Sequence, residues 1–291
     1  MKTTVVITSF KEPKTIGKTI DSFLKQKTKR KFEIIVSAPD EETLDVARKY
    51  KVKIFKDPGK GKSLALNLLF KKIKSDILIL TDGDVFVNNG AVEEILSMFE
   101  NPKIGCVTGR PAPLENRKTK YGYWANFLFD AAHNIRQKAF INKNFIECSG
   151  YLFAFRRNQI KQIPLDVAED SIIPYFFAQK RYLIGYADKA EVYVKNTDNW
   201  RDWVKQKIRT SKAHETIGKY ANINKIKRVK SFSNESKGIF QLFLYPKNLK
   251  EFWWGLELAF ARVYIWIRVM WDTKVKNRSY KDNWERVDST K

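Results

Sequence analysis

The first half of the chain alternates short runs of β-branched apolar residues with segments whose apolar residues recur at helical spacing. The runs predict strands and the spaced segments predict helices. Strands that alternate with helices are typical of an α/β protein whose mostly parallel sheet is covered by helices. In chain order the pattern predicts strands at 4–8, 32–36, 52–55, 76–81, 104–108, 151–155, 182–187 and 191–194, with helices over 14–26 and 43–50 and from residue 64.

An acidic turn, Asp82-Gly83-Asp84, follows directly on the predicted strand at 76–81. Ligands of open α/β sheets bind beyond the carboxyl ends of the strands, so this turn is where we expect chemistry. Two carboxylates can bind a hard divalent cation, and the glycine between them lets a diphosphate approach the backbone. The same three residues also suit an ordinary turn, so the motif needs support from its neighbours.

A glycine-rich segment, Gly59-Lys60-Gly61-Lys62, lies between a predicted strand and a predicted helix. Backbone N–H groups and lysines in such a place meet phosphate oxygens, although a solvated basic turn has the same composition. Gly61-Lys62-Ser63 also matches the end of a P-loop, but Lys56 stands where that motif needs its first glycine. A P-loop-like phosphotransferase therefore remains an alternative with weaker support.

Two further patterns lie in the second half. Glu169-Asp170 opens a predicted helix, where acidic residues also serve as caps and as partners of the helix dipole. Gln206 and Arg209 are three residues apart, so on a helix they share a face and reach one ligand together, and His214 follows them.

In their order and spacing, these motifs resemble those of family 2 glycosyltransferases, over residues 3 to 215. The resemblance implies a GT-A fold, which is a Rossmann-like, mostly parallel central sheet flanked by helices. It implies an inverting transfer of a sugar from a nucleotide-diphosphate sugar, with UDP favoured over GDP. The motifs that carry the resemblance are Thr4-Val-Val-Ile-Thr, Glu33-Ile-Ile-Val, Gly61-Lys62 with Ala65-Leu-Asn67, Asp82-Gly-Asp84, Ser149-Gly150-Tyr151, Glu169-Asp170 and Gln206-x-x-Arg209.

The resemblance also implies roles for residues at the diphosphate end of the site. Asp82 and Asp84 match the family's metal-binding pair, which would hold Mg²⁺ or Mn²⁺ against the nucleotide diphosphate. Lys62 would lie near that diphosphate. After the second predicted strand, where many members have Asp-Asp-Gly-Ser, this chain has Ser37-Ala-Pro-Asp40, and Asp40 is the residue expected at the nucleobase. His214 would complete the metal shell.

Other roles concern the acceptor end. Glu169-Asp170 matches the catalytic pair, with Asp170 as the base that takes a proton from an acceptor hydroxyl. If the acceptor is a lipid phosphate, Asp170 would orient it instead. Gly150 and Tyr151 would line the acceptor pocket. Gln206 and Arg209 would lie beneath the site and hold both donor and acceptor in place.

The last third of the chain has a different character, and we expect residues 1–215 to form the catalytic domain and residues 216–291 a basic, aromatic-rich helical tail. Residues 252–271, at helical spacing, place an apolar arc that includes Trp253, Phe260 and Ile267 opposite Glu257, Arg262 and Arg268. These three charges disfavour a membrane span. We expect this amphipathic helix to lie on an anionic membrane surface, and the alternative is that it docks on the catalytic domain or on a second subunit.

The charge balance supports anionic partners. The formal net charge is +23, and residues 201–291 carry 21 Lys and Arg against 9 Asp and Glu. The first residues read as a strand, and two cysteines suit a reducing compartment, so we expect a cytoplasmic protein that is peripheral on the cytoplasmic face of the cell membrane. The expected acceptor is a polyprenyl phosphate or a lipid-linked glycan. We expect no nucleic-acid partner, because no known nucleic-acid module is recognisable, although a non-catalytic protein that binds nucleic acid or membranes stays an alternative.

Overall fold

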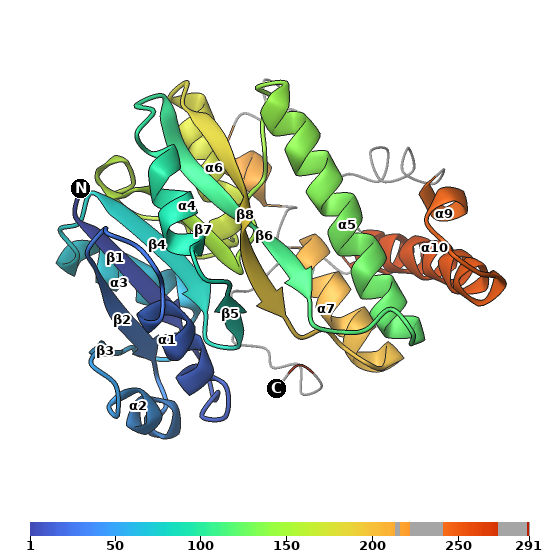
Figure 1. The fold of residues 1–291 in the computed structure, drawn as a ribbon, viewed down its shortest axis with the longest axis horizontal. Coiled ribbons are helices and arrows are strands. Elements are labelled where there is room, and N and C mark those ends of the chain that lie inside the picture. The colour runs from blue at the N-terminus through green and yellow to red at the C-terminus, as the bar shows by residue number, and fades with distance from the viewer. Residues whose placement is uncertain (213–215, 222–240, 273–289, 291) are drawn as a thin grey trace.

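The computed structural model describes the whole chain except residues 213–215, 222–240, 273–289 and 291. Its centre is one eight-stranded sheet with the strand order β3-β2-β1-β4-β7-β6-β8-β5 (Figure 1). The strands are β1 (Thr3–Thr8), β2 (Phe32–Ala38), β3 (Lys53–Lys56), β4 (Ile77–Asp82), β5 (Val85–Val87), β6 (Ile104–Pro113), β7 (Leu152–Arg156) and β8 (Leu183–Val194).

The sheet is mostly parallel. β3, β2, β1 and β4 run in one direction, and β6 and β8 also pair in parallel. β7 lies antiparallel between β4 and β6, and the short β5 pairs antiparallel with β8 at the edge. The predicted α/β fold with a mostly parallel sheet flanked by helices is therefore confirmed.

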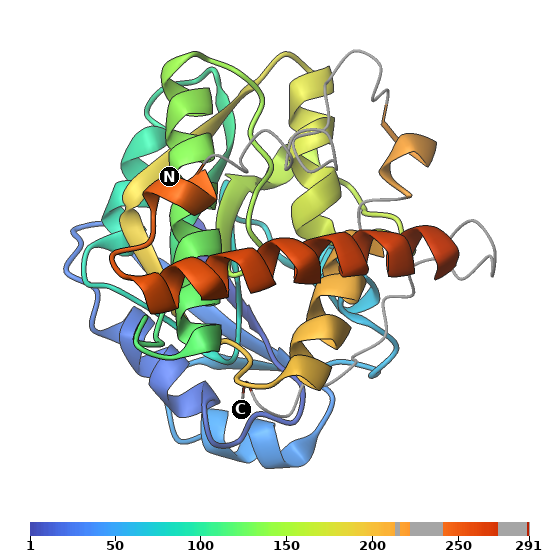
Figure 2. The same ribbon diagram turned by 90° about the vertical axis from the view of Figure 1, so that its right-hand side faces the viewer.

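Helices cover both faces of the sheet (Figures 1 and 2). α1, α2 and α4 pack on one face, while α3 and α6 pack on the other. The helices are α1 (Ile16–Leu24), α2 (Glu41–Ala47), α3 (Lys62–Lys72), α4 (Ala91–Met98), α5 (Lys120–Ile141), α6 (Glu169–Gln179), α7 (Trp200–Lys212), α9 (Gln241–Leu244) and α10 (Leu249–Met270), with 3₁₀ turns at Arg157–Gln159 and Ile217–Lys219.

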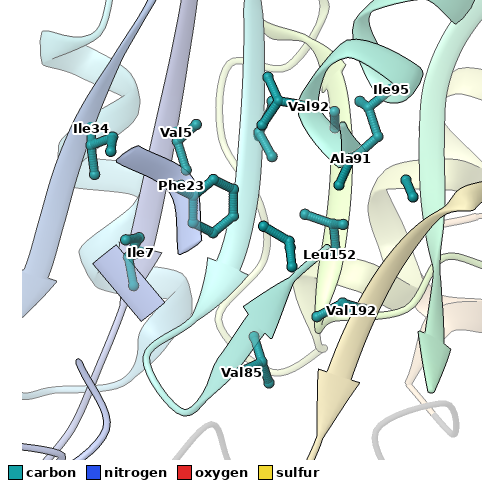
Figure 3. Close-up of a cluster of buried hydrophobic side chains, with 14 of the residues drawn as sticks. Val5, Ile7, Phe23, Ile34, Val85, Ala91, Val92, Ile95, Leu152 and Val192 are labelled. Carbon is teal, nitrogen blue, oxygen red and sulfur yellow. The ribbon is translucent and has the colours of Figure 1, made fainter. Parts of the chain in front are cut away.

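Alternation along the strands divides the core between these two faces. Val5 and Ile7 of β1 pack with Phe23 of α1 and Ile95 of α4 on one side (Figure 3), while Val6 points into the opposite cluster with α3 and α6. Successive strand residues face opposite sides, so a strand of continuous apolar residues such as β1 is buried on both.

The structure differs from the sequence pattern at β8 and β5. The strands predicted at 182–187 and 191–194 are one strand, because the pairing with β6 skips residues 188–190 at an irregularity and then continues. The polar residues of this bulge look like a strand boundary in the sequence. β5 is only three residues long, and the pattern does not predict it.

α10 packs against α5 and α7. Its buried residues include Leu258, Ala261 and Ile265, which join an aromatic cluster with Trp124 of α5 and Trp203 of α7. Two polar contacts also link these parts of the chain. The indole N–H of Trp124 donates to the main-chain oxygen of Trp254 at 2.7 Å, and Arg117 forms an ion pair with Glu251 at 2.6 Å.

The predicted helix is confirmed, but the arc that docks on the protein is the one opposite to the predicted apolar arc. Trp253, Phe260 and Ile267 of the predicted arc are 64%, 76% and 60% exposed. Small residues on the docked arc, such as Gly255 and Ala261, let α10 approach its neighbours closely. The bulky aromatic residues of the other arc would keep the helices further apart. α10 is therefore apolar on two sides, one docked and one exposed.

The docked face gives the first prediction. Ile265 is fully buried and Ile267 is largely exposed, so Ile265→Ala should cost about 2–5 kcal/mol of unfolding free energy and Ile267→Ala less than about 0.5 kcal/mol. Urea denaturation followed by tryptophan fluorescence measures both. Equal effects of the two substitutions would contradict the docking of α10.

Candidate functional site

The acidic turn stands at the carboxyl end of β4 and is fixed by its neighbours. The Gly83 N–H donates to the main-chain oxygen of Thr8 at 2.9 Å, and the Thr19 hydroxyl donates to the Gly83 oxygen at 3.0 Å. A Cβ atom at Gly83 would lie 2.3 Å from Ser9 Oγ. Only glycine fits here, so the spacing of Asp82 and Asp84 is built into the fold.

The sequence analysis does not identify Ser9 and Glu12, two residues that pack beside this turn. Ser9 donates to Glu12 Oε2 at 2.6 Å, and Glu12, only 7% exposed, also receives support because its N–H donates to Thr43 Oγ1 at 2.9 Å. The one signal for Glu12 in the sequence is that an acidic residue stands in the loop after the first strand, directly before Pro13. Its burial depends on contacts with distant segments, which the local pattern does not contain.

Lys62 joins the acidic turn to the Glu-Asp pair. α3 begins at Lys62, directly after Gly61, whose φ of 103° suits glycine. The Lys62 ammonium lies 2.6 Å from Asp82 Oδ1 and 2.6 Å from Glu169 Oε1. Burial by itself would lower the pKa of Lys62, but the two carboxylates outweigh it and hold this pKa well above its ordinary value. Three separate motifs therefore meet at one charged centre.

The carboxylates of this centre repel one another. Burial, together with the charge of Asp82, raises the pKa of Asp84 to about 7. Burial also raises the pKa of Glu169 to about 7, with Lys62 opposing the shift and Asp170 adding to it. Both pKa values are raised although Lys62 is present, so a further cation would stabilise the ionised carboxylates.

Gly150 and Tyr151 lie against these acids. A Cβ atom at Gly150 would come within 3.1 Å of Asp170 Oδ2, and the Thr81 hydroxyl holds the Tyr151 main-chain oxygen at 2.7 Å. Burial raises the pKa of the Tyr151 phenol, and the charges of Asp84 and Asp82 raise it further. Both residues thus lie between the acidic turn and Asp170.

α7 brings Arg209 to the same centre. The positive charge of Arg209 lowers the pKa of both Asp84 and Tyr151, so Arg209 contributes to the electrostatics of this centre. Gln206 stands one helical turn earlier on α7. His214 lies outside the described residues.

Asp40 occupies a different part of the sheet edge, at the start of α2. Its carboxylate accepts the N–H of Lys11 at 2.8 Å and the N–H of Thr43 at 3.0 Å, so it caps the helix. Asp57 follows the neighbouring β3, accepts from Ser37 Oγ at 3.1 Å and is only 5% exposed. Burial raises the pKa of Asp57, and the sequence analysis does not identify this residue.

The donor set at the acidic turn fits a hard divalent cation. Asp82 and Asp84 offer oxygen ligands, and their mutual repulsion is relieved by a bound cation. Within the described residues, no group of three or more His, Cys, Asp or Glu side chains is placed to hold a metal ion. The protein would supply two carboxylates, and substrate oxygens and water would complete the coordination.

Comparison with known proteins identifies similar chains. A sequence model of the family described as Glycosyl transferase family 2 matches residues 4–163. The O-antigen chain rhamnosyltransferase RfbN of Salmonella typhimurium is 26% identical over an alignment of 216 residues, and the alignment covers 69% of this chain and 68% of that protein.

Solved structures share the fold at low sequence identity. The mannosyltransferase PcManGT from Pyrobaculum calidifontis, in complex with GDP-Man and Mn²⁺, has a TM-score of 0.60 at 15% identity and aligns over 93% of this chain and 87% of that one. S. aureus TarS 1-349, in complex with UDP-GlcNAc, has a TM-score of 0.50 at 14% identity over 97% and 93% of the two chains. These likenesses confirm the GT-A fold.

The pKa of Asp84 predicts how the metal-free protein responds to pH. A carboxyl with a pKa of about 7 when folded and about 4 when unfolded contributes stability below pH 4 that is lost as the pH rises through 7. Asp84→Asn removes this loss. In EDTA at pH 8 the variant should melt about 3 °C or more above the wild type, and at pH 4.5 the two should melt alike.

Differential scanning fluorimetry measures this effect. Asp21→Asn is the matched control, because Asp21 forms an exposed pair with Lys25 on α1. It should leave the melting temperature unchanged at both pH values. A difference between Asp84→Asn and the wild type that is as large at pH 4.5 as at pH 8 would rule out the shifted carboxyl.

Proposed function

The chain belongs to glycosyl transferase family 2, and we propose that it binds a nucleotide sugar at Asp82 and Asp84 and transfers the sugar to an acceptor beside Asp170. The observation that carries this proposal is the placement of Lys62, which joins the acidic turn to the Glu-Asp pair through two contacts of 2.6 Å. Family membership makes the chain a nucleotide-sugar-dependent glycosyltransferase. This favours sugar transfer over the P-loop-like phosphotransferase and over a non-catalytic binding protein.

The donor end of the site would hold the diphosphate. Mg²⁺ or Mn²⁺ bound at Asp82 and Asp84 supplies positive charge to the leaving diphosphate. Lys62 is close enough to Asp82 to add to this charge. Gln206 and Arg209 of α7 would hold donor and acceptor from the side opposite the sheet, and the charge of Arg209 already lowers the pKa of Asp84.

The acceptor end lies at the start of α6. Asp170 would take the proton from an acceptor hydroxyl while that oxygen attacks the anomeric carbon from the side opposite the diphosphate, which inverts the configuration. Glu169 is held by Lys62 and fixes the first turn of α6. Gly150 leaves room beside Asp170 because it has no side chain, and Tyr151 would contact the acceptor next to it.

The nucleobase would lie near Asp40, at the carboxyl end of β2. A carboxylate there accepts the imide N–H of a uracil, and we propose UDP ahead of GDP as the donor nucleotide. The comparison structures contain both kinds of donor, GDP-Man in one and UDP-GlcNAc in the other.

The tail would orient the enzyme on an anionic membrane surface, at its cytoplasmic face. The exposed arc of α10 presents Trp253, Phe260, Ile267 and Trp271 to solvent, and aromatic and basic residues together suit the headgroup region. No helix in the described part of the chain is long and apolar enough to span a membrane. A surface-bound enzyme would reach a polyprenyl phosphate or a lipid-linked glycan, which is the acceptor class we propose.

Calorimetric titration of UDP and GDP, each with and without Mn²⁺, tests the donor site. We expect Mn²⁺-dependent binding that Asp84→Ala weakens at least tenfold, because one of two metal-binding carboxylates is lost. Asp170→Asn is the matched control, since it should keep nucleotide binding and lose transfer by about 10²-fold or more. A folded wild type that binds neither nucleotide would overturn the proposed donor site.

Sedimentation with phosphatidylglycerol vesicles tests the membrane surface. Replacing Phe260 and Ile267 by Glu should reduce binding at least tenfold. Burial of each apolar side chain in the membrane interface contributes about 1.5–3 kcal/mol to the free energy of binding. Leu24→Glu is the control, because Leu24 is an exposed apolar residue at the end of α1, and this variant should bind as the wild type does. Binding that survives the double substitution would contradict a role for this arc.

A further inference from the structure

The second half of α5 carries a polar cluster outside the site described above. His133 and Arg136 lie on successive turns of the face that meets β8. His133 Nδ1 is 2.7 Å from the hydroxyl of Tyr186, a residue of β8 that is only 3% exposed.

His133 and Tyr186 form one hydrogen-bonded pair. Burial lowers the pKa of His133 and the charge of Arg110 lowers it further, against Asp188 and Asp130, which raise it. Burial also raises the pKa of the Tyr186 phenol to about 12. The pair engages Nδ1 of His133, which leaves Nε2 as the ring nitrogen that a ligand can meet.

Arg136 is half-buried and has no carboxylate partner among the residues that the structure describes. Its Nε donates to the main-chain oxygen of Glu147 at 3.3 Å. The neighbouring Arg110, in contrast, forms an ion pair with Glu191 at 3.4 Å, and Asp188 accepts from Gln137 at 3.5 Å. Half-buried charges are usually paired, so the guanidinium of Arg136 is a place where an anion would be stabilised.

This cluster lies next to the acceptor end of the site. Cys148 stands two residues before Gly150. Burial and the neighbouring Cys106 raise the pKa of Cys148, and Asp170 raises it further while Arg136 lowers it. Arg136 donates to the main-chain oxygen of Glu147 at 3.3 Å, and a Cβ atom at Gly150 would lie 3.1 Å from Asp170 Oδ2, so both side chains lie against the segment that leads into β7. Figure 2 shows α5 and α6, the helices that carry them, on either side of this segment.

We propose that Arg136 and His133 bind a phosphate group of the acceptor. The guanidinium offers a fork of N–H donors that matches phosphate oxygens, and the imidazole adds Nε2–H. The inference rests on the proposed function, because it takes the acceptor to lie beside Asp170 and Gly150. The phosphate belongs to a lipid acceptor or is free in solution, and the test separates these sources.

The experiment titrates farnesyl phosphate, farnesol and inorganic phosphate into the full chain by calorimetry. Arg136→Gln should weaken farnesyl phosphate binding about tenfold to a hundredfold, as expected for loss of a charge-assisted contact. Lys138→Gln is the matched control, because it removes the same charge from an exposed position two residues along α5, and it should change binding less than twofold. Farnesol binding should not depend on Arg136.

The outcomes are distinct. Farnesyl phosphate that binds much more tightly than inorganic phosphate identifies the lipid source, and equal affinities for the two, both lost in Arg136→Gln, identify free phosphate. A wild type that binds neither phosphate, or an Arg136→Gln protein that binds both unchanged, overturns the inference. Mn²⁺-dependent binding of UDP or GDP is measured on the same samples, and its absence in the wild type overturns the proposed function instead.

Discussion

The ion pairs of Lys62 are the interaction on which the arrangement of the site depends. One ammonium holds Asp82 at the end of β4 and Glu169 at the start of α6, both at 2.6 Å. These segments are far apart in the sequence and meet only through the sheet. Burial and the charge of Asp82 keep the pKa of Asp84 raised, although Lys62 and Arg209 oppose this shift. The fold therefore holds buried carboxylates close together at the place where we propose that a metal ion and a diphosphate bind.

The sequence predicts those site residues whose positions follow from local sequence patterns. Asp82 and Asp84 follow a strand of an α/β pattern, and Glu169 with Asp170 opens a helix, so both positions follow from short-range periodicity and the topology of parallel sheets. No local sequence pattern identifies Glu12 or Asp57 as residues of the site. Their importance arises from burial against distant segments, with Thr43 as the distant partner of Glu12 and Ser37 as that of Asp57, and a single sequence does not contain these contacts.

The tail shows a second limit of sequence patterns. Helical spacing predicts α10 correctly, but the largest apolar arc is not the one that docks. Packing depends on fit as much as on apolar content, and Gly255 and Ala261 allow the backbone of α10 to approach α5 and α7. Large side chains such as Phe260 are left on the outside. A helix that is apolar on two sides has two candidate contact faces, and only the tertiary structure decides between them.

α5 connects the two surfaces that an acceptor from a membrane would meet. Its first half packs with α10 through Trp124, and its second half carries His133 and Arg136. A helix of 22 residues is about 33 Å long and behaves as a stiff rod. The docking of α10 on one end therefore fixes the direction in which the exposed arc faces relative to the polar cluster at the other. If α10 lies on a lipid surface, the length of α5 determines how far the phosphate of an acceptor must move from that surface to reach Arg136 and His133.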